Sequence, residues 1–406
     1  MKIAFIVSAF PSLSETFILN QITGLLDLGH EVEIIAFQKS PEKKIHQSVE
    51  KYQLLEKVSF VDMPAKKSTR LGRAFLLFFK NLPKNPLKIL KSLNFFKYGR
   101  EAYSLRLFYF LLPFLNKKFA IIHAHFGPNG RMAIKLKELG IRARFITTFH
   151  GYDANCYPKD AGKDIYLSLF KEGDLFTTNT NFTREQIEKL GCPREKILIL
   201  PVGLEMGEFD FYERKLEPGE RITILTVGRL VEKKGHAYAI KALAKLTKNH
   251  PHFEYLIVGD GPLREELKEL VFRLKLNDKI KFLGALDQAE IQKIYQQAHL
   301  FLLPSITAKN LDREGQALVL QEAQAVGLPI VSTYHNGIPE GVLEGKSAFL
   351  VPEKDIAALA NKIVYLFDNP GIWGGMGKDG RKFVEKRYDI KKLNQRLVEI
   401  YQNLLE

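Results

Sequence analysis

The sequence contains very little cysteine. Among its 406 residues only Cys156 and Cys192 occur, and neither belongs to a Cys-x-x-Cys pair or to a cluster with histidine. This argues against a disulfide framework and a structural zinc site, and it favours a reducing compartment. Long apolar runs are also lacking, since the longest, Leu107 to Leu115, is too short to span a bilayer. No secretion signal is recognisable at the N-terminus, so we expect a cytoplasmic protein.

Acidic residues are absent from the whole segment between Pro64 and Arg100, in a chain whose formal net charge is +14. Ten basic residues lie there: Lys66, Lys67, Arg70, Arg73, Lys80, Lys84, Lys88, Lys91, Lys97 and Arg100. At helical spacing among them lie four apolar residues: Leu71, Phe75, Phe78 and Phe79. An apolar stripe beside cations suits an anionic membrane surface, which would place the protein on the inner face of the plasma membrane. A core-facing helix with a solvated basic side is the alternative. Nucleic acid is not expected as a partner, because no recognised nucleic-acid-binding module accompanies the basic run.

Short apolar strands alternate with amphipathic helices along the chain. In the first half we expect strands at Ile3–Val7, Val32–Ala36, Ile121–Ala124 and Phe145–Thr148, with helices at Leu13–Leu28 and Gly130–Leu139. In the second half we expect strands at Ile222–Val227, Tyr255–Val258, Ile280–Phe282, Leu300–Leu303 and Ile330–Ser332, with helices at Gly235–Leu246, Gln288–Ala298 and Gln316–Ala325. Ser12 and Glu15 are predicted to form a capping box at the first helix, and Gly29 to end it. This alternation is typical of parallel, doubly wound α/β sheets.

The regular alternation lapses between Pro201 and Glu220, where glycine, proline and charged residues collect. We therefore expect two Rossmann-like domains, residues 1–205 and 206–385, that face each other across a ligand cleft. Residues 386–406 form a further segment, and from Lys391 to Leu405 they are predicted to be helical.

Glu314 and Glu322 stand eight positions apart, and good helix formers fill the residues from Ala317 to Ala325. The pattern predicts that Glu314-Gly315 lies at a helix N-terminus. Eight residues are a little over two turns, so both carboxylates would share one face, about 12 Å apart along the axis. Amides of the first turn, between the two carboxylates, could bind a phosphate. The alternative is that Glu322 is a solvated surface carboxylate.

Glycines and cations follow two strands of the second half. Gly228-Arg229-Leu230 and Lys233-Lys234-Gly235 come directly after the Ile222–Val227 strand, where Arg229 and Lys234 could reach an anion in the cleft. Gly261 is predicted to belong to a tight turn that borders the cleft, and the backbone at Ala285 could meet a nucleobase edge. Neither a dinucleotide fingerprint nor a P-loop occurs. Each of these segments could also be an ordinary solvated loop.

Histidines end two strands of the first half. His150 precedes Gly151 and could face the cleft, whereas His123 and His125 flank a strand end. A His-x-His pair could bind a metal, but no third ligand is identifiable, so we expect no metal site. For His123 a structural role is expected, and the role of His125 stays open.

Several of these motifs together resemble one known family. They are Gly228-Arg229-Leu230, Lys234-Gly235, Gly259-Asp260-Gly261, Glu314 with Glu322, and Gly337-Ile338-Pro339-Glu340-Gly341. In this order and spacing they resemble the retaining glycosyltransferases of family 4, which have the GT-B fold. The first half is similar more loosely, through Ile122–Phe126 and Thr148–Asp153. Those two segments, Ser14–Phe17 and Glu314–Gln316 are similar to the bacterial exopolysaccharide, colanic-acid-type branch.

The resemblance implies a role for each matching position. Arg229 and Lys234 would bind the donor diphosphate, Glu322 the ribose, and Glu314 the transferred sugar. The amides of Gln316, Ala317 and Leu318 would lie near the phosphates. The resemblance also places His150 beneath the sugar and has the last helix cross back to the N-terminal domain.

The chain departs from the family pattern after its first strand. Many members have a Gly-Gly pair there, where this sequence reads Pro11 to Glu15. Ser14 or Glu15 is therefore expected to meet the acceptor, and His125 and Asp153 are further candidates on that side.

We expect a retaining, metal-independent glycosyltransferase that needs no cofactor. It would move a sugar from a UDP- or GDP-sugar to a hydroxyl of a saccharide or lipid-linked acceptor, in exopolysaccharide or glycolipid synthesis. The chain lacks Asp-x-Asp, so Arg229, Lys234 and the helix N-terminus would neutralise the diphosphate. Two alternatives are a nucleotide-sugar epimerase or hydrolase on the same fold, and a non-catalytic binding protein.

Overall fold

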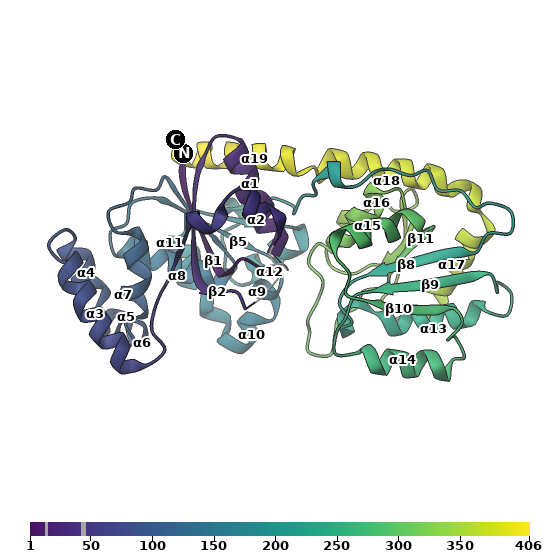
Figure 1. Ribbon diagram of the computed structural model, residues 1–406, viewed down its shortest axis with the longest axis horizontal. Helices are drawn as coiled ribbons and strands as arrows, with labels where there is room; N and C mark the ends of the chain where they lie inside the picture. The colour runs from purple at the N-terminus through teal and green to yellow at the C-terminus, as the bar shows by residue number, and fades with distance from the viewer. Residues whose placement is uncertain (13–14, 42–45) are drawn as a thin grey trace.

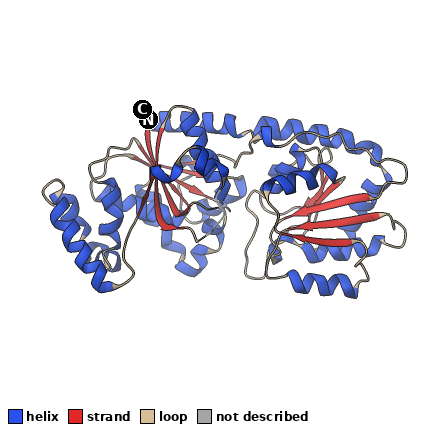
Figure 2. Cartoon of the chain, viewed as in Figure 1, coloured by secondary structure: helices blue, strands red, loops and turns tan. Residues whose placement is uncertain are grey.

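The computed structural model describes residues 1–12, 15–41 and 46–406, and it contains two parallel β-sheets with helices on their faces (Figures 1 and 2). The first sheet has the order β3-β2-β1-β4-β5-β6-β7. Its strands are β1 (Lys2–Phe10), β2 (Glu31–Lys39), β3 (Val58–Phe60), β4 (Ile121–His125), β5 (Arg144–Phe149), β6 (Leu175–Thr178) and β7 (Ile197–Ile199). The second sheet has the order β10-β9-β8-β11-β12-β13. Its strands are β8 (Ile222–Val227), β9 (Phe253–Val258), β10 (Ile280–Gly284), β11 (Leu300–Leu303), β12 (Ile330–Thr333) and β13 (Ala348–Val351).

Helices connect the strands in both halves. Those of the first half are α1 (Thr16–Asp27), α2 (Gln47–Lys51), α3 (Lys67–Asn81), α4 (Pro86–Ser92), α5 (Phe95–Tyr98), α6 (Arg100–Tyr103), α7 (Arg106–Leu111), α8 (Gly127–Glu138), α9 (Tyr152–Asn155), α10 (Tyr157–Ala161), α11 (Leu167–Glu172) and α12 (Asn181–Lys189). Those of the second half are α13 (His236–Leu246), α14 (Arg264–Arg273), α15 (Gln288–Gln297), α16 (Leu318–Ala325), α17 (Ile356–Asp368), α18 (Trp373–Arg387) and α19 (Ile390–Leu405). Short 3-10 helices join several of them, among them η8 (Pro339–Gly341).

The α/β class with two Rossmann-like units is confirmed, because every strand pair in both sheets is parallel. The strands can be covered on both faces because they are almost continuously apolar, as in β8, where every residue is buried. The strand order reverses between β1 and β4 and between β8 and β11. Ligands of such sheets bind at the carboxyl ends of the strands beside these reversals. The loops after β4, β5, β8 and β11 are therefore the ones to examine.

Two predictions on where helices begin need correction: the cap of α1 and the first residue of α16. Helix α1 begins at Thr16 with Glu15 as its N-cap residue, so Ser12 is not the cap; the predicted start at Leu13 lies outside the described residues. Its end is as predicted, since Gly29 has a φ of 79° and its N–H donates to the carbonyl of Leu26. Helix α16 begins at Leu318 and not at Gln316.

The last helix joins the two domains along one side of the molecule. Helix α19 follows α18 and packs against α1, and in Figure 1 both run as a yellow rod past the two domains. The Nδ2 group of Asn394 donates to the carbonyl of Asn20, 3.1 Å away. Further along, the Tyr401 hydroxyl lies 2.6 Å from Nδ1 of His123, whose Nε2 lies 2.6 Å from the Thr148 hydroxyl. His123 therefore has a structural role, in the middle of a buried chain of hydrogen bonds from Tyr401 to Thr148.

Replacing Tyr401 with Phe is expected to destabilise the fold without affecting any surface group. The buried His123 Nδ1 would lose its partner, which costs about 1–3 kcal/mol. Urea unfolding followed by circular dichroism measures the loss. Tyr365→Phe is the matched control, since the Tyr365 side chain is exposed. Equal stability of Tyr401→Phe and wild type would contradict the structural place assigned to this contact.

Candidate active site

The loops after β5 and β11 meet where the two domains face each other. A Cβ built on Gly315 would lie 2.9 Å from the carbonyl oxygen of His150 and 3.1 Å from Nδ2 of Asn179. A Cβ on Gly151, whose φ is +123°, would lie 3.6 Å from the Cα of Gly315. Any side chain at position 315 would therefore push these loops apart. The chain places His150 and Glu314 on the two sides of this contact.

Glu314 is a buried carboxylate between two lysines. Its Oε2 accepts a hydrogen bond from Nζ of Lys234 at 3.1 Å, and its Oε1 lies 3.9 Å from Nζ of Lys233. Lys233 itself is held 3.1 Å from Oδ1 of Asp312. Oε1 of Glu314 accepts no hydrogen bond from any residue that the structure describes. A buried acceptor without a donor is costly, so this oxygen is well suited to a ligand hydroxyl.

The backbone of Glu314 is fixed from β12. Its N–H donates to Nε2 of His335 at 3.1 Å, and the Nδ1 of His335 lies 2.6 Å from Oε1 of Glu353. This arrangement requires the proton on Nδ1, so the ring is neutral. Burial lowers the pKa of His335, although Glu353 opposes the shift. Asn336 adds a bond from its Nδ2 to the Glu314 carbonyl at 3.1 Å.

The charge of Glu314 is set by its two lysines. Burial alone would raise the pKa of its carboxyl, but Lys234 and Lys233 outweigh burial and bring that pKa below the ordinary 4.5. The carboxylate is therefore ionised at neutral pH. Burying such a charge requires a partner, because an unpaired buried ion costs several kcal/mol.

Gly228 lets Lys234 reach this site. A Cβ on Gly228 would lie 3.3 Å from Cε of Lys234, so the lysine stem passes directly over the backbone of that residue. Arg229 is exposed, and its guanidinium forms no ion pair with the described residues; its carbonyl lies 3.1 Å from Nε2 of His236. Gly261 packs as closely on Leu230, since its Cβ would lie 2.6 Å from the Leu230 carbonyl oxygen. The predicted tight turn at Gly261 thus brings two loops together.

The segment before α16 is not helical, which corrects the predicted geometry of the two glutamates. Ala317 is the N-cap of α16 with a φ of +56°, so Glu314 lies in the loop and not on the face of that helix. The side chain of Gln316 holds this loop, because its Oε1 accepts from the Val202 N–H at 2.7 Å and its Nε2 donates to the Val202 carbonyl at 2.8 Å. The N–H groups of Gln316, Ala317 and Leu318 find no acceptor among the described residues. They remain available to an anion at the helix N-terminus.

Glu322 is half-buried and not a solvated surface group. It accepts a hydrogen bond from the Tyr295 hydroxyl at 2.9 Å, and burial raises the pKa of its carboxyl. Together with Leu318 it lines a hollow of about 60 Å³ between the domains, whose opposite wall includes Phe17. Ala285 is exposed, just after the end of β10.

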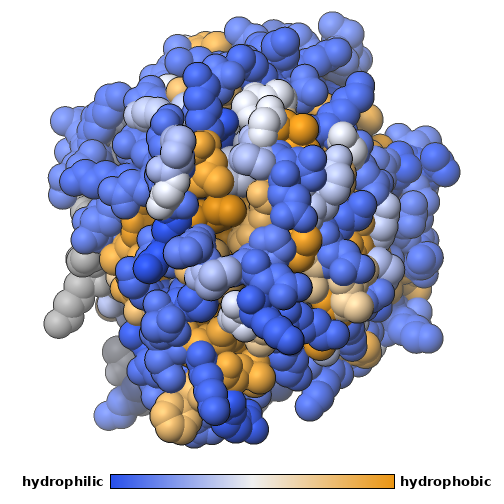
Figure 3. Space-filling model, turned by 90° about the vertical axis from the view of Figure 1, so that its right-hand side faces the viewer, coloured by the Kyte–Doolittle hydropathy of each residue, from blue (hydrophilic) through white to orange (hydrophobic). Residues whose placement is uncertain are grey.

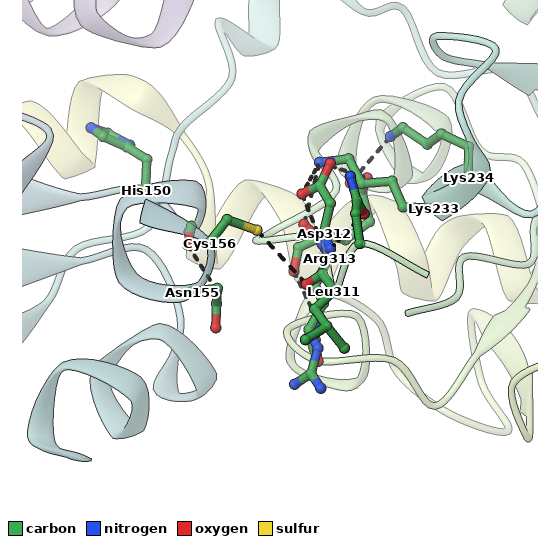
Figure 4. Close-up of polar contacts among 12 residues, drawn as sticks. His150, Asn155, Cys156, Lys233, Lys234, Leu311, Asp312 and Arg313 are labelled. Atoms are coloured by element: carbon green, nitrogen blue, oxygen red, sulfur yellow. Dashed lines mark hydrogen bonds and ion pairs between the residues drawn. The ribbon is translucent and has the colours of Figure 1, made fainter. Parts of the chain in front are cut away.

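His150 lies on the N-terminal side of the contact, and the lysines lie on the other (Figure 4). Its Nε2 is 3.0 Å from Nδ1 of His125, and its ring centroid is 4.5 Å from that of Phe17. Burial lowers the pKa of His150 to about 3, so the ring is neutral. His125 is fully buried, which removes it from direct contact with an acceptor, and its Nε2 has no partner among the described residues.

The other acceptor-side candidates lie elsewhere. Asp153 is buried, and its carboxylate accepts hydrogen bonds from the N–H groups of Gly127, His150 and Gly151 at 2.8, 2.9 and 3.0 Å. It therefore shapes the turn that carries His150 and does not face an acceptor. Glu15, the N-cap of α1, lines a small hollow that includes Pro11. Ser14 lies outside the described residues.

Glu340 links the domains, a role that the sequence did not indicate. Its Oε2 accepts from the N–H of Asn181 at 2.9 Å and its Oε1 from that of Phe182 at 3.1 Å. These N–H groups open α12 of the N-terminal domain, while Glu340 belongs to η8 of the C-terminal domain. A carboxylate at a helix N-terminus is favourable. This carboxylate and the contact at Gly315 hold the two halves of the site together.

The sequence predicts no place in the site for His335 and Glu353, and no role of its own for Lys233 beside Lys234. Only Lys233 carried a signal, since it is adjacent to Lys234. Within the described residues, no group of three or more His, Cys, Asp or Glu side chains is placed to hold a metal ion.

Comparisons with known proteins agree with the fold and the motifs. Residues 14–207 match the family described as Glycosyltransferase Family 4, and residues 208–388 match Glycosyl transferases group 1. The putative colanic acid biosynthesis glycosyltransferase WcaL of Salmonella typhimurium is 37% identical over the full length of both chains. The amylovoran biosynthesis glycosyltransferase AmsK of Erwinia amylovora is 34% identical, again over both full lengths. The crystal structure of Anabaena HepE with UDP and glucose has a TM-score of 0.71 at 18% identity, covering 99% of this chain and 100% of that one; this likeness concerns the fold.

Replacing Glu314 with Gln is expected to flatten the pH dependence of stability at acidic pH. The folded pKa of Glu314 is depressed, so its stabilisation is complete above the unfolded pKa and is lost as the pH falls through the folded pKa. Urea unfolding between about pH 5 and pH 3 should therefore show a smaller loss for Glu314→Gln than for wild type. Glu265→Gln, at an exposed carboxylate paired with Lys268, should retain the wild-type slope. Identical slopes in all three proteins would contradict the depressed pKa.

Proposed function

The chain belongs to glycosyltransferase family 4, and from that premise we propose that it transfers a sugar from a nucleoside-diphosphate sugar to a hydroxyl group. The transfer retains the anomeric configuration and needs no metal ion. Support comes above all from Glu314, whose carboxylate is buried between Lys234 and Lys233 with one oxygen lacking a donor. The proposed reaction follows from how a bound diphosphate and a bound sugar would change the ion pairs of Glu314.

The donor would replace one ion pair by another. A diphosphate carries more negative charge than a carboxylate, so it would draw the Nζ of Lys234 from Glu314. Glu314 would then have both oxygens free for hydroxyls of the sugar, with Lys233 still nearby as its counter-charge. Exposed Arg229 and the free N–H groups before α16 would bind the phosphates. Glu322 would take the ribose hydroxyls, in the hollow that it lines.

The same cations would stabilise the leaving group. As the bond from the anomeric carbon to the diphosphate oxygen breaks, negative charge develops on the phosphates, and Lys234 and Arg229 would interact with it more strongly than with the intact donor. The acceptor oxygen would bond to the anomeric carbon on the face that the diphosphate leaves, and its proton would pass to the departing phosphate. Neutral His150 would lie on the N-terminal side of this reaction. The step involves no covalent intermediate: Glu314 would hold hydroxyls of the sugar, and Asp153 accepts hydrogen bonds from backbone N–H groups.

The acceptor is a saccharide or a lipid-linked saccharide, and the pathway is exopolysaccharide synthesis. Support comes from two full-length relatives, one named for colanic acid and one for amylovoran biosynthesis. The protein would work at the inner face of the plasma membrane, in keeping with its basic segment from residue 64 to 100. The donor base stays open between uracil and guanine, because exposed Ala285 offers only backbone to a base edge.

A transfer assay with a panel of UDP- and GDP-sugars and saccharide acceptors tests this function. The wild type should give product with the anomeric configuration of the donor, as read by NMR, at an unchanged rate in EDTA. Glu314→Ala and Lys234→Ala should each lower kcat/KM by about 10²–10³-fold, because each removes a contact to the reacting groups. Circular dichroism establishes that both variants are folded.

Glu265→Ala and Lys268→Ala serve as controls, because this exposed pair lies outside the site. Near-normal turnover in a folded Glu314→Ala or Lys234→Ala variant would contradict the assignment. Consumption of the donor alone, without an acceptor, would indicate the epimerase or hydrolase alternative. Tight binding of the donor without turnover would indicate a binding protein.

A further inference from the structure

Helices α3 to α6 form a projecting part of the N-terminal domain that leaves large apolar side chains uncovered. Of the 15 residues of α3, only Ala74 is buried. Nine exposed apolar or aromatic residues lie on these helices: Leu71, Phe75, Leu76, Phe79, Leu87, Leu90, Phe95, Phe96 and Tyr103. We call them the apolar patch. Phe96 is 89% exposed, which is unusual for a phenylalanine in water. Helix α3 does turn Ala74, Leu77 and Phe78 toward the core of the N-terminal domain, as the core-facing alternative predicted, but it leaves Leu71, Phe75 and Phe79 exposed.

A hollow opens beside this patch. Its volume is about 210 Å³, and it is lined by Leu71, Ala74, Phe75, Phe78, Leu93, Leu105 and Phe108. These side chains offer water no hydrogen bond. Hollows of this size with apolar walls favour apolar occupants over water. A hydrocarbon chain fits this chemistry.

Between Pro64 and Arg100 all the charged residues are basic, and the acids nearest to them are Asp62, Glu101 and Glu138. Among the ten basic residues between Pro64 and Arg100, only Arg73 and Lys97 form ion pairs with described residues, namely with Asp62 and Glu138. The other cations have no acidic partner in the described part of the chain, and the segment itself contains no acid. Basic residues without an acidic partner therefore lie beside exposed phenylalanines. Such a surface is complementary to a partner with anionic groups at its surface and an apolar interior. An anionic lipid bilayer has this arrangement.

We propose that α3 to α6 dock on an anionic lipid bilayer, with the apolar patch in its interface and an acyl chain in the hollow. No helix in the described residues is both long enough and apolar enough to cross the bilayer. Bilayer docking rests on the proposed function only in its biological purpose, which is to bring the enzyme to a lipid-linked acceptor in the same bilayer.

The position of the patch fixes the orientation of the bound protein. Helices α3 to α6 lie at the end of the N-terminal domain that points away from the C-terminal domain (Figure 1). The far end of the molecule, formed by the C-terminal domain, shows hydrophilic side chains that separate its hydrophobic patches (Figure 3). On the bilayer, the N-terminal domain would therefore face the lipid, and the donor-binding half would remain in the aqueous phase.

Vesicle binding of the full chain without any nucleotide sugar tests the docking, so its failure would leave the proposed glycosyl transfer untouched. Flotation with vesicles of phosphatidylcholine and phosphatidylglycerol should recover the wild type, whereas vesicles of phosphatidylcholine alone should recover much less. Phe96→Ser should lower the partition coefficient about tenfold. Phe272→Ser, at a 72% exposed phenylalanine of α14, should leave it unchanged. A charge test uses Lys80, Lys84 and Lys91 replaced by Gln, with Lys241, Lys245 and Lys248 replaced by Gln as the control of equal charge.

Tryptophan substitution locates the lipid chain. The chain has a single tryptophan, Trp373, which is fully buried and gives a constant background. Phe78→Trp in the hollow and Phe96→Trp on the patch should be quenched by vesicles with brominated acyl chains, and Phe272→Trp should not. The proposal would be overturned by equal recovery with both vesicle types, by equal loss in the test and control variants, or by binding without quenching at position 78. A dimer in sedimentation that Phe96→Ser abolishes would also overturn it, because the patch would then bind a second copy of the chain.

Discussion

A carboxylate buried inside a protein requires a counter-charge, and this constraint governs the candidate site. Glu314 is almost fully buried, so its charge is tolerable only because Lys234 and Lys233 lie beside it. The two lysines are placed by the loop after β8, and Glu314 by the loop after β11, which are neighbouring strands at the reversal of the second sheet. The fold thus brings the charges together, and the charges hold the loops in position. In the proposed function, a donor diphosphate would enter this arrangement because it would offer Lys234 a stronger partner.

The second constraint is the closeness of the two domains. The backbone of Gly315 touches the loop that carries His150, and only a residue without a side chain can lie there. Glu340 caps α12 across the same interface, and α19 extends from one domain onto the other. The glycine contact, the capping carboxylate and the last helix all fix the position of the N-terminal domain relative to Glu314. The position of His150 relative to Glu314 is therefore set by interdomain contacts and not by the second domain alone.

The repeated pattern of strands and helices was predictable, because β8, β9 and β11 are apolar runs that are buried on both faces. The resemblance carried the main site residues, and the structure brings Glu314 and Lys234 together. The partners of these residues were not predictable, since the bonds of Glu314 to His335 and of Gln316 to Val202 join residues far apart in the sequence. For the same reason the start of α16 was misplaced: propensity favours a helix at Gln316, but a tertiary hydrogen bond holds it in a loop. Asp153 lies in a segment that matches the family, yet its carboxylate accepts hydrogen bonds from backbone N–H groups. A matching motif therefore does not by itself show that a carboxylate faces a ligand.

Calorimetric titration of a nucleoside diphosphate and of the matching nucleotide sugar into Glu314→Gln and Lys234→Met tests the separation of roles most directly. If Lys234 binds phosphate and Glu314 binds sugar, Lys234→Met loses affinity for both ligands. Glu314→Gln then loses affinity for the nucleotide sugar. It keeps its affinity for the nucleoside diphosphate, because the diphosphate would no longer compete with a carboxylate for Lys234. Equal losses of both ligands in Glu314→Gln would contradict the account, because Glu314 would then serve the phosphate site and not the sugar.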